Sequence, residues 1–242
     1  MIKSTLLAAA LLAAGASHAA TVTQWNFNST PSDSLSSTGT LTPNIGSGTA
    51  SLLGGTTATF ASGDANGGST DPVTAVPVSA TNDSGWNLST FATQGTGDKT
   101  RGAQFAVSTV GLQGISFSYD LRHSNTAPRT EVVQYSLDGF SFVDIATFSG
   151  PLGDTWFNNR SVDLSSITST DDNASLAFRV VAAFEPSTSA YSASTGSSTY
   201  STAGTWRFDM VTVSAVPEPQ SLAMLLAGLG LVGSIAIRRR AR

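Results

Sequence analysis

The sequence predicts an all-β protein whose strands form an antiparallel β-sandwich. About ten short segments alternate apolar and polar residues with a period of two, and turn residues separate them about every 8–12 positions. Between its two ends the chain shows no 3.6-residue apolar period, which a helix would require. Charged residues make up only 12 % of the chain. Such a composition favours short strands with polar outer faces over surface helices.

The expected strands share this alternation. They are residues 21–27, 86–91, 103–109, 113–121, 130–137, 141–148, 160–164, 176–184 and 205–214, with two weaker strands between 49 and 61. Asp138-Gly139 predicts a hairpin turn, and a change of phase near Met210 predicts a β-bulge in the last strand. We expect the two sheets to bury Trp25, Phe105, Phe117, Tyr119, Val133, Tyr135, Phe142, Phe178, Val180, Trp206 and Phe208.

The N-terminus predicts export. Lys3 supplies a positive start, Leu6 to Ala14 an apolar stretch, and Ser17-His18-Ala19 a small-residue cleavage site. The apolar stretch is too short to span a membrane. Residues 1–19 are therefore interpreted as a signal peptide, which implies export through the Sec translocon. Residues 20–215 then form one β-sandwich domain.

The C-terminal residues 216–242 predict a tail directed to the membrane. It opens with Val216-Pro217-Glu218-Pro219, and we expect the last strand to end before this motif because proline fixes φ and lacks an N–H donor. The 16 uncharged residues from Leu222 to Ile237 would span roughly 24 Å as a helix, a little less than the ~30 Å hydrocarbon core. The cluster Arg238-Arg239-Arg240 marks the cytoplasmic side, so the body lies across the membrane from it.

These three parts, in this order, resemble the PEP-CTERM sorting signal of Gram-negative bacteria. The resemblance covers residues 216–242 and implies that exosortase, a membrane protease-transpeptidase, recognises the tail. It also implies that the tail anchors the protein only transiently in the inner membrane. The expected final location is the outer surface or the extracellular space, where exopolysaccharide is a candidate partner. The alternative is an ordinary single-span anchor.

The body itself resembles a group of exported jelly-roll domains that occur on PEP-CTERM proteins. The resemblance spans residues 86–214 and is carried by Arg122-His123-Ser124-Asn125-Thr126, Trp156-Phe157-Asn158-Asn159-Arg160 and Trp206-Arg207-Phe208-Asp209. It implies a jelly-roll form of the sandwich. It implies no particular activity.

Composition excludes several classes of function. Residues 21–215 contain seven basic and fifteen acidic residues, which gives a formal charge of −8. A protein this acidic and without a basic patch is not expected to bind nucleic acid. The chain has no cysteine, so disulfides and thiolate metal sites are excluded.

Three classes of function remain. No nucleophile elbow, zinc-protease motif or phosphate-binding loop occurs, which favours a non-enzymatic protein of the cell surface or extracellular matrix. A carbohydrate-binding module is the alternative, with Trp86 and Trp156 as candidate ligand-binding aromatic residues, and with Tyr191 as a third exposed candidate. The remote alternative is an extracellular hydrolase. It would have to use His123 with a carboxylate, whereas the simpler interpretation of His123 is a hydrogen bond that caps a loop.

A structural calcium ion is possible at the last strand, with Asp209 and Asn28 as candidate ligands; no other cofactor is expected. Calcium needs six to eight oxygen ligands, so the loop that contains Asp64, Asp71 and Asp83 would have to supply a further acid. The simpler alternative is an ion pair. Arg207 and Asp209 lie two residues apart and share a face of the strand, so they can pair with each other or with a neighbouring strand.

Overall fold

The computed structural model describes residues 19–64 and 83–218. In these two ranges the chain forms eleven strands and one 3₁₀ turn (Thr168–Thr170), and no helix is long and apolar enough to cross a membrane. Residues 1–18 of the predicted signal peptide and the predicted sorting helix, residues 222–237, lie outside the described residues. The strands are β1 (Ala20–Trp25), β2 (Thr49–Leu53), β3 (Thr57–Ser62), β4 (Ser84–Ser89), β5 (Gly102–Val107), β6 (Leu112–His123), β7 (Thr130–Ser136), β8 (Val143–Ser149), β9 (Thr155–Asp163), β10 (Leu176–Ala183) and β11 (Trp206–Pro217).

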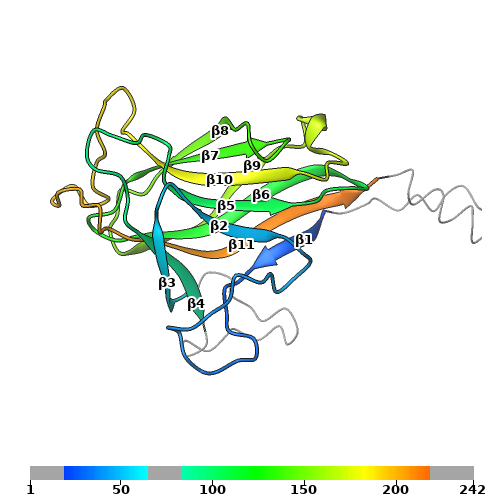
Figure 1. Ribbon diagram of the computed structural model, residues 1–242, viewed down its shortest axis with the longest axis horizontal. Coiled ribbons are helices and arrows are strands. Elements are labelled where there is room, and N and C mark those ends of the chain that lie inside the picture. The colour runs from blue at the N-terminus through cyan, green and yellow to red at the C-terminus, as the bar shows by residue number, and fades with distance from the viewer. Residues whose placement is uncertain (1–18, 65–82, 219–242) are drawn as a thin grey trace, which may run out of the picture.

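The strands form two antiparallel sheets, and the predicted fold class is confirmed. The sheet called here the β11 sheet has the order β3-β4-β11-β6-β9, with β1 paired to the second part of β11. The other, called here the β10 sheet, has the order β2-β5-β10-β7-β8. Its strands run side by side along the long axis of the molecule (Figure 1). The chain passes repeatedly from one sheet to the other, which gives the arrangement of a jelly roll.

Aromatic side chains fill the space between the two sheets. Phe117 of the β11 sheet stacks on Phe178 of the β10 sheet, with ring centroids 4.4 Å apart and an interplanar angle of 3°. Both rings are fully buried. The buried indole of Trp206 donates its N–H to the backbone oxygen of Pro128 at 2.8 Å, so this polar group carries no desolvation penalty.

The predicted bulge in the last strand is confirmed. Met210 has φ of 47°, and the pairing of β11 with β6 shifts between Asp209 and Thr212. Phe208 before the bulge and Val211 after it both point into the core at 0 % exposure. The extra residue of the bulge therefore explains the change of phase seen in the sequence.

Two strand ends differ from the sequence prediction. Strand β9 begins at Thr155, five residues earlier than expected, because the edge position beside β6 extends its pairing to His123. Strand β11 continues to Pro217, where we expected it to stop before the proline motif. In the described chain β1 pairs with β11 only as far as Ala215, so beyond this residue β11 has a strand partner on one side only. A proline can occupy the unpaired side because no partner strand there requires its missing N–H donor.

A buried polar network joins the two sheets between β8 and β9. Glu131 of β7 faces the core at 0 % exposure and accepts a hydrogen bond from the hydroxyl of Tyr119 at 3.0 Å. The Nε atom of Arg160 lies 3.1 Å from the other carboxylate oxygen, and Nε2 of His123 lies 3.6 Å from it. The guanidinium of Arg160 also rests over the ring of Phe148 at 4.9 Å. Burial, and then the charge of Glu131, raise the pKa of Tyr119 well above its usual value, which keeps its phenol a donor.

We predict that the network contributes to stability mainly through the charge balance of Glu131 and Arg160. Glu131→Gln should lower the free energy of unfolding by about 3 kcal/mol, because it leaves a buried guanidinium without its carboxylate. The double variant with Arg160→Met should recover part of this loss, since no charge then remains unbalanced. Urea unfolding of the wild type and the two variants measures both effects. A Glu131→Gln variant as stable as the wild type would contradict the interpretation.

Candidate functional site

The outer face of the β10 sheet carries polar side chains in register across its strands. Side chains alternate along a strand, so Phe178 and Val180 point to the core while Arg179 lies on the outer face. One row crosses all five strands and consists of Ser51, Gln104, Arg179, Gln134 and Asp144. The next row consists of the small residues Thr49, Ala106, Ala177 and Ser136. The face therefore offers a band of hydrogen-bonding groups beside a band of small side chains.

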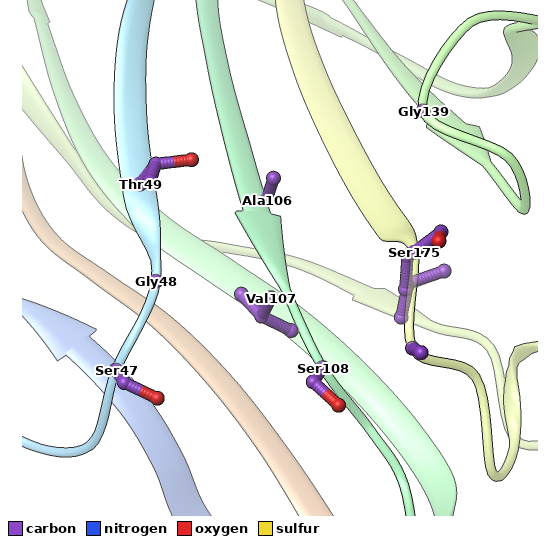
Figure 2. A pocket seen from close by; sticks show the side chains of 10 residues that line it. Ser47, Gly48, Thr49, Ala106, Val107, Ser108, Gly139 and Ser175 are labelled. Atoms are coloured by element: carbon purple, nitrogen blue, oxygen red, sulfur yellow. The ribbon is translucent and has the colours of Figure 1, made fainter.

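A shallow pocket of about 350 Å³ lies where the small row meets the end of the sheet. Ala106 on β5 stands between Thr49 on β2 and Ser175, which directly precedes β10 (Figure 2). Ser47 and Ser108 also line it. Within the described chain, no hydrogen bond uses the hydroxyl of Thr49 or Ser175. The pocket thus combines apolar small side chains with hydroxyl groups that remain available to a ligand.

The turn between β7 and β8 forms one wall of the pocket. Oδ1 of Asp138 accepts hydrogen bonds from the backbone N–H groups of Ser141 at 2.7 Å and Phe140 at 2.8 Å, and these bonds hold the pKa of Asp138 well below its usual value. Gly139 adopts φ of 79° and lines the pocket (Figure 2). The next residue, Phe140, is 88 % exposed. The turn that lines the pocket through Gly139 therefore also carries an exposed aromatic residue.

Arg179 lies at the centre of the five-strand row and is held from two sides. Its Nε donates to Oε1 of Gln104 at 2.8 Å, and its guanidinium carbon lies 3.5 Å from the ring centroid of Phe142. We expected Phe142 in the core, and this is wrong: the residue belongs to the turn before β8, so the strand alternation does not direct it inward. Burial lowers the pKa of Arg179.

The carboxylate in the same row is already engaged. Asp144 accepts hydrogen bonds from Nζ of Lys99 at 2.5 Å and from Nε2 of Gln134 at 2.7 Å. Burial opposes its ionisation, but the bonds from Lys99 and Gln134 outweigh it and keep the pKa of Asp144 below its usual value. The Lys99–Asp144 pair therefore has no net charge. The positive charge of Arg179 is then the uncompensated charge in the middle of the row.

The aromatic residues predicted to bind a ligand do not gather at this pocket. Trp86 is 2 % exposed and packs in the core against Phe27, with centroids 5.8 Å apart, so its ring is closed to a surface ligand. Tyr191 is 3 % exposed and stacks on Tyr200. Trp156 is half-buried on edge strand β9 of the opposite sheet. Of the three, only Trp156 keeps a surface position, and it lies on the opposite sheet from the pocket.

His123 meets a carboxylate, but not in a cleft. Its Nε2 lies 3.6 Å from Oε1 of Glu131, and its Nδ1 lies 2.9 Å from the backbone oxygen of Pro128. Both His123 and Glu131 are 0 % exposed. The Pro128 contact has the geometry that the loop-capping interpretation expects, and a substrate has no access to the pair.

Four aspartates gather on the outer face of the β11 sheet, at the bulge. Asp209 and Asp120 are direct cross-strand partners, and Asp209 also accepts from the backbone N–H of Asp64 at 3.0 Å. A methyl group built on Gly63 would lie 2.6 Å from Oδ2 of Asp209 and 2.7 Å from Oδ1 of Asp83. The loop ends therefore bring Asp64 and Asp83 to Asp209, as the calcium hypothesis requires.

Other observations at the same place bear on the calcium hypothesis. In residues 19–64 and 83–218 no three His, Cys, Asp or Glu side chains are grouped so as to hold a metal ion. Oδ1 of Asn28, the second predicted ligand, accepts the backbone N–H of Ser84 at 2.7 Å. Arg207 donates to the backbone oxygen of Ser62 at 2.7 Å and to Oδ1 of Asn87 at 3.4 Å rather than pairing with Asp209. The calcium site stays a prediction, while the expected Arg207–Asp209 pair does not form.

Sequence reasoning missed the pocket and most of the polar row. The alternation does place Arg179 between two core residues, so its outward position could have been found. The neighbours of Arg179 in space come from strands that lie far away in the sequence, and register between such strands leaves no local signal. The exposure of Phe140 depends on the detailed geometry of the turn.

We predict that Asp120 makes the stability of the protein fall as pH rises from about 4 to about 6. Burial raises the pKa of Asp120 to about 6, the N–H of Asn159 opposes this, and the charge of Asp64 adds to it. The folded protein then holds the proton more tightly than the unfolded chain, whose Asp titrates near 3.9, so stability present below pH 4 is lost as pH passes through 6. In EDTA, Asp120→Asn should therefore gain about 5–9 °C in Tm relative to the wild type between pH 4 and 7.

The same melts with millimolar calcium test the metal site. A bound cation favours ionised carboxylates and stabilises the native state, so calcium should raise the wild-type Tm at pH 7 and reverse the trend with pH. Equal melting temperatures in calcium and EDTA would remove the calcium site. An unchanged difference between wild type and Asp120→Asn from pH 4 to 7 would contradict the role of Asp120.

The predicted sorting motif is only partly described by the structure. Val216 and Pro217 pair with Gln113 and Leu112 at the end of β11, and the N–H of Glu218 donates to the backbone oxygen of Gly111 at 3.1 Å. Pro219 and Arg238-Arg239-Arg240 lie outside the described residues. The described part of the motif therefore lies at the end of β11, the middle strand of the β11 sheet (Figure 1).

Comparison with solved structures finds matches of low sequence identity. The CBM22-1-GH10 modules of Clostridium thermocellum endo-1,4-beta-D-xylanase 10B, complexed with xylohexaose, match with 14 % identity and a TM-score of 0.41 over 69 % of this chain and 26 % of that chain. This chain thus spans about a quarter of the xylanase structure. The CBM22-1 xylan-binding domain of Paenibacillus barcinonensis Xyn10C matches with 12 % identity and a TM-score of 0.40, over 70 % and 86 % of the two chains. The K1 cleaved adhesin domain of Porphyromonas gingivalis Lys-gingipain matches with 13 % identity and a TM-score of 0.35, over 72 % and 99 %.

Comparison of the sequence gives a more specific result for the tail. No curated protein sequence matches the chain. A family model described as the PEP-CTERM protein-sorting motif matches residues 215–240, which include both the proline motif and the arginine cluster. The chain therefore carries a PEP-CTERM protein-sorting motif behind an all-β antiparallel sandwich.

Proposed function

We propose that this is an exported, non-catalytic protein of the cell surface or extracellular matrix that binds polysaccharide on the outer face of its β10 sheet. The signal peptide directs the sandwich across the inner membrane, the sorting motif anchors it there transiently, and exosortase removes the tail. The observation that carries the proposal is the combination, on one face, of a hydroxyl-lined pocket and a row of amide and guanidinium groups.

The chemistry of the face suits a sugar polymer. Sugars present many hydroxyl groups and apolar ring faces, and the pocket offers the hydroxyls of Thr49 and Ser175 around the methyl group of Ala106. Phe140, which follows the pocket-lining Gly139 in the turn, supplies an exposed aromatic surface. A shallow, open face also lets a long polymer pass over it without a chain end entering.

The same pocket favours binding over catalysis. Its lining residues among the described part of the chain are Ser, Gly, Thr, Ala, Val and Leu, and none of them titrates near neutral pH. The pair that resembles acid–base machinery, His123 with Glu131, is fully buried and joins the sheets instead. These observations support a protein that holds a ligand without cleaving it.

The delivery part of the proposal predicts a processed C-terminus. Intact mass spectrometry of the mature protein from its native host should find a chain that lacks residues 222–242, because exosortase acts at the sorting motif. Replacing Arg238, Arg239 and Arg240 with neutral residues should disturb membrane orientation and lower the yield of mature protein. Surface-located protein that still carries Arg242 would instead support an ordinary anchor.

The binding part predicts that the mature protein associates with polysaccharide through the pocket. Affinity electrophoresis against the extracellular polysaccharide of the host, a neutral galactan and a neutral β-glucan should show retardation by at least one polymer. The double variant Thr49→Ala/Ser175→Ala should bind roughly 10- to 100-fold more weakly, because it loses two hydrogen bonds of about 1–1.5 kcal/mol each. Ala106→Trp should block the pocket sterically.

A matched control removes hydroxyls from the opposite sheet. Ser116→Ala/Ser161→Ala changes two outward serines of β6 and β9 that pair across the β11 sheet with other residues, so polysaccharide binding should stay at the wild-type level. No retardation by any polymer, or equal loss in the pocket and control variants, would contradict binding at this face.

A further inference from the structure

The guanidinium of Arg179, in the polar row, is fixed in position by its neighbours. Its Nε is engaged by Gln104, and the ring of Phe142 covers one face of the guanidinium, so the side chain has little freedom left to lose on binding. Among the described residues, no hydrogen bond or ion pair uses its two terminal nitrogens. These nitrogens form a planar fork that matches the geometry of a carboxylate.

The other cations of the described chain use their terminal nitrogens within the protein. Arg101 and Arg207 donate to the backbone oxygens of Thr90 and Ser62. Lys99, Arg122, Arg129 and Arg160 each lie within 4.0 Å of a carboxylate. The carboxylate in the row of Arg179 is held by Lys99 and Gln134. Arg179 is therefore a fixed, partly desolvated positive charge whose counter-ion the described part of the chain does not supply.

The row of Arg179 lies next to the pocket. Along β5, Gln104 of the polar row and Ala106 of the pocket are two residues apart, which is about 7 Å of strand. One polymer chain can therefore occupy the pocket and pass over the guanidinium with a neighbouring unit. The relation between the two is fixed by strand register and does not depend on a loop.

We propose that the outer face of the β10 sheet selects polysaccharides that carry carboxylate groups, and that Arg179 binds the carboxylate of a uronic acid unit through its terminal nitrogens. The inference rests on the proposed polysaccharide binding and adds the substrate class. Gln104 and Phe142 position the guanidinium, while the pocket binds an adjacent unit through its hydroxyls.

The test compares one polymer in two charge states. Polygalacturonate and the neutral galactan made from it by reduction of its carboxyl groups have the same linkages and differ only at the carboxylate. The mature protein should bind polygalacturonate at least tenfold more tightly at low ionic strength, and the preference should shrink as salt is added. Arg179→Gln should lose the tenfold preference, so that its affinities for the two polymers become equal.

Two further variants separate charge, fork geometry and folding. Arg179→Lys keeps the charge and loses the fork, so it should lose most of the preference; it also serves if Arg179→Gln does not fold. Arg122→Gln removes a cation from the outer face of the β11 sheet and should change neither affinity. Thermal melts check that each variant is folded.

The possible outcomes distinguish the two proposals. Equal affinity of the wild type for both polymers overturns carboxylate selection and leaves polysaccharide binding standing. If both Arg179 variants still prefer polygalacturonate to the neutral polymer, Arg179 does not bind the carboxylate. Tighter binding to dextran sulfate than to polygalacturonate overturns the assignment to a carboxylate. Binding to neither polymer nor to any other polysaccharide overturns the proposed function itself.

Discussion

The structure depends on the packing of two aromatic rings from opposite sheets. Phe117 on β6 and Phe178 on β10 stack at 4.4 Å with nearly parallel planes, and each belongs to a central strand of its sheet. Because a strand has a period of two, fixing Phe178 inward also fixes Ala177 and Arg179 outward. The position of the one cation proposed to select the ligand thus follows from a core contact. A slip of one residue in β10 would bury the guanidinium and expose the ring.

The open edge of the sandwich is closed by charged groups together with aromatic packing, because the guanidinium of Arg160 rests over the rings of Phe148 and Phe157. Between β8 and β9 the facing side chains include Glu131, Arg160 and Tyr119, where a core of this kind usually contains branched aliphatic residues. A buried ion pair adds little net stability compared with an apolar pair, but it tolerates only one arrangement of the two sheets. The edge network therefore sets how the β10 sheet sits on the β11 sheet, and the apolar core supplies most of the stabilisation.

The sequence predicts the fold well because alternation and turn chemistry are local signals. Asp138-Gly139 and the phase change at Met210 identify a hairpin and a bulge without knowledge of any neighbour. The candidate site is different. Trp86 looks like a surface aromatic in the sequence, and only its pairing opposite Phe60 and Phe208 places it in the core. Phe142 looks like a core residue in the sequence but lies outside the core, because β8 begins only at the next residue, Val143. Burial of these residues depends on long-range register, which local pattern does not contain.

The net charge of the sandwich, −8, argues at first against an anionic polymer as ligand. Charges on the surface act only over about 8 Å at physiological ionic strength, however, so what a bound unit experiences is the local arrangement. Near Arg179 the acidic residue of the row is neutralised by Lys99, and the guanidinium remains. The acidic cluster of Asp64, Asp120, Asp83 and Asp209 lies on the other sheet, across the whole core. Overall repulsion would slow the approach of an acidic chain and discourage contact elsewhere, so on the proposed binding face Arg179 and the pocket together would decide where the polymer binds.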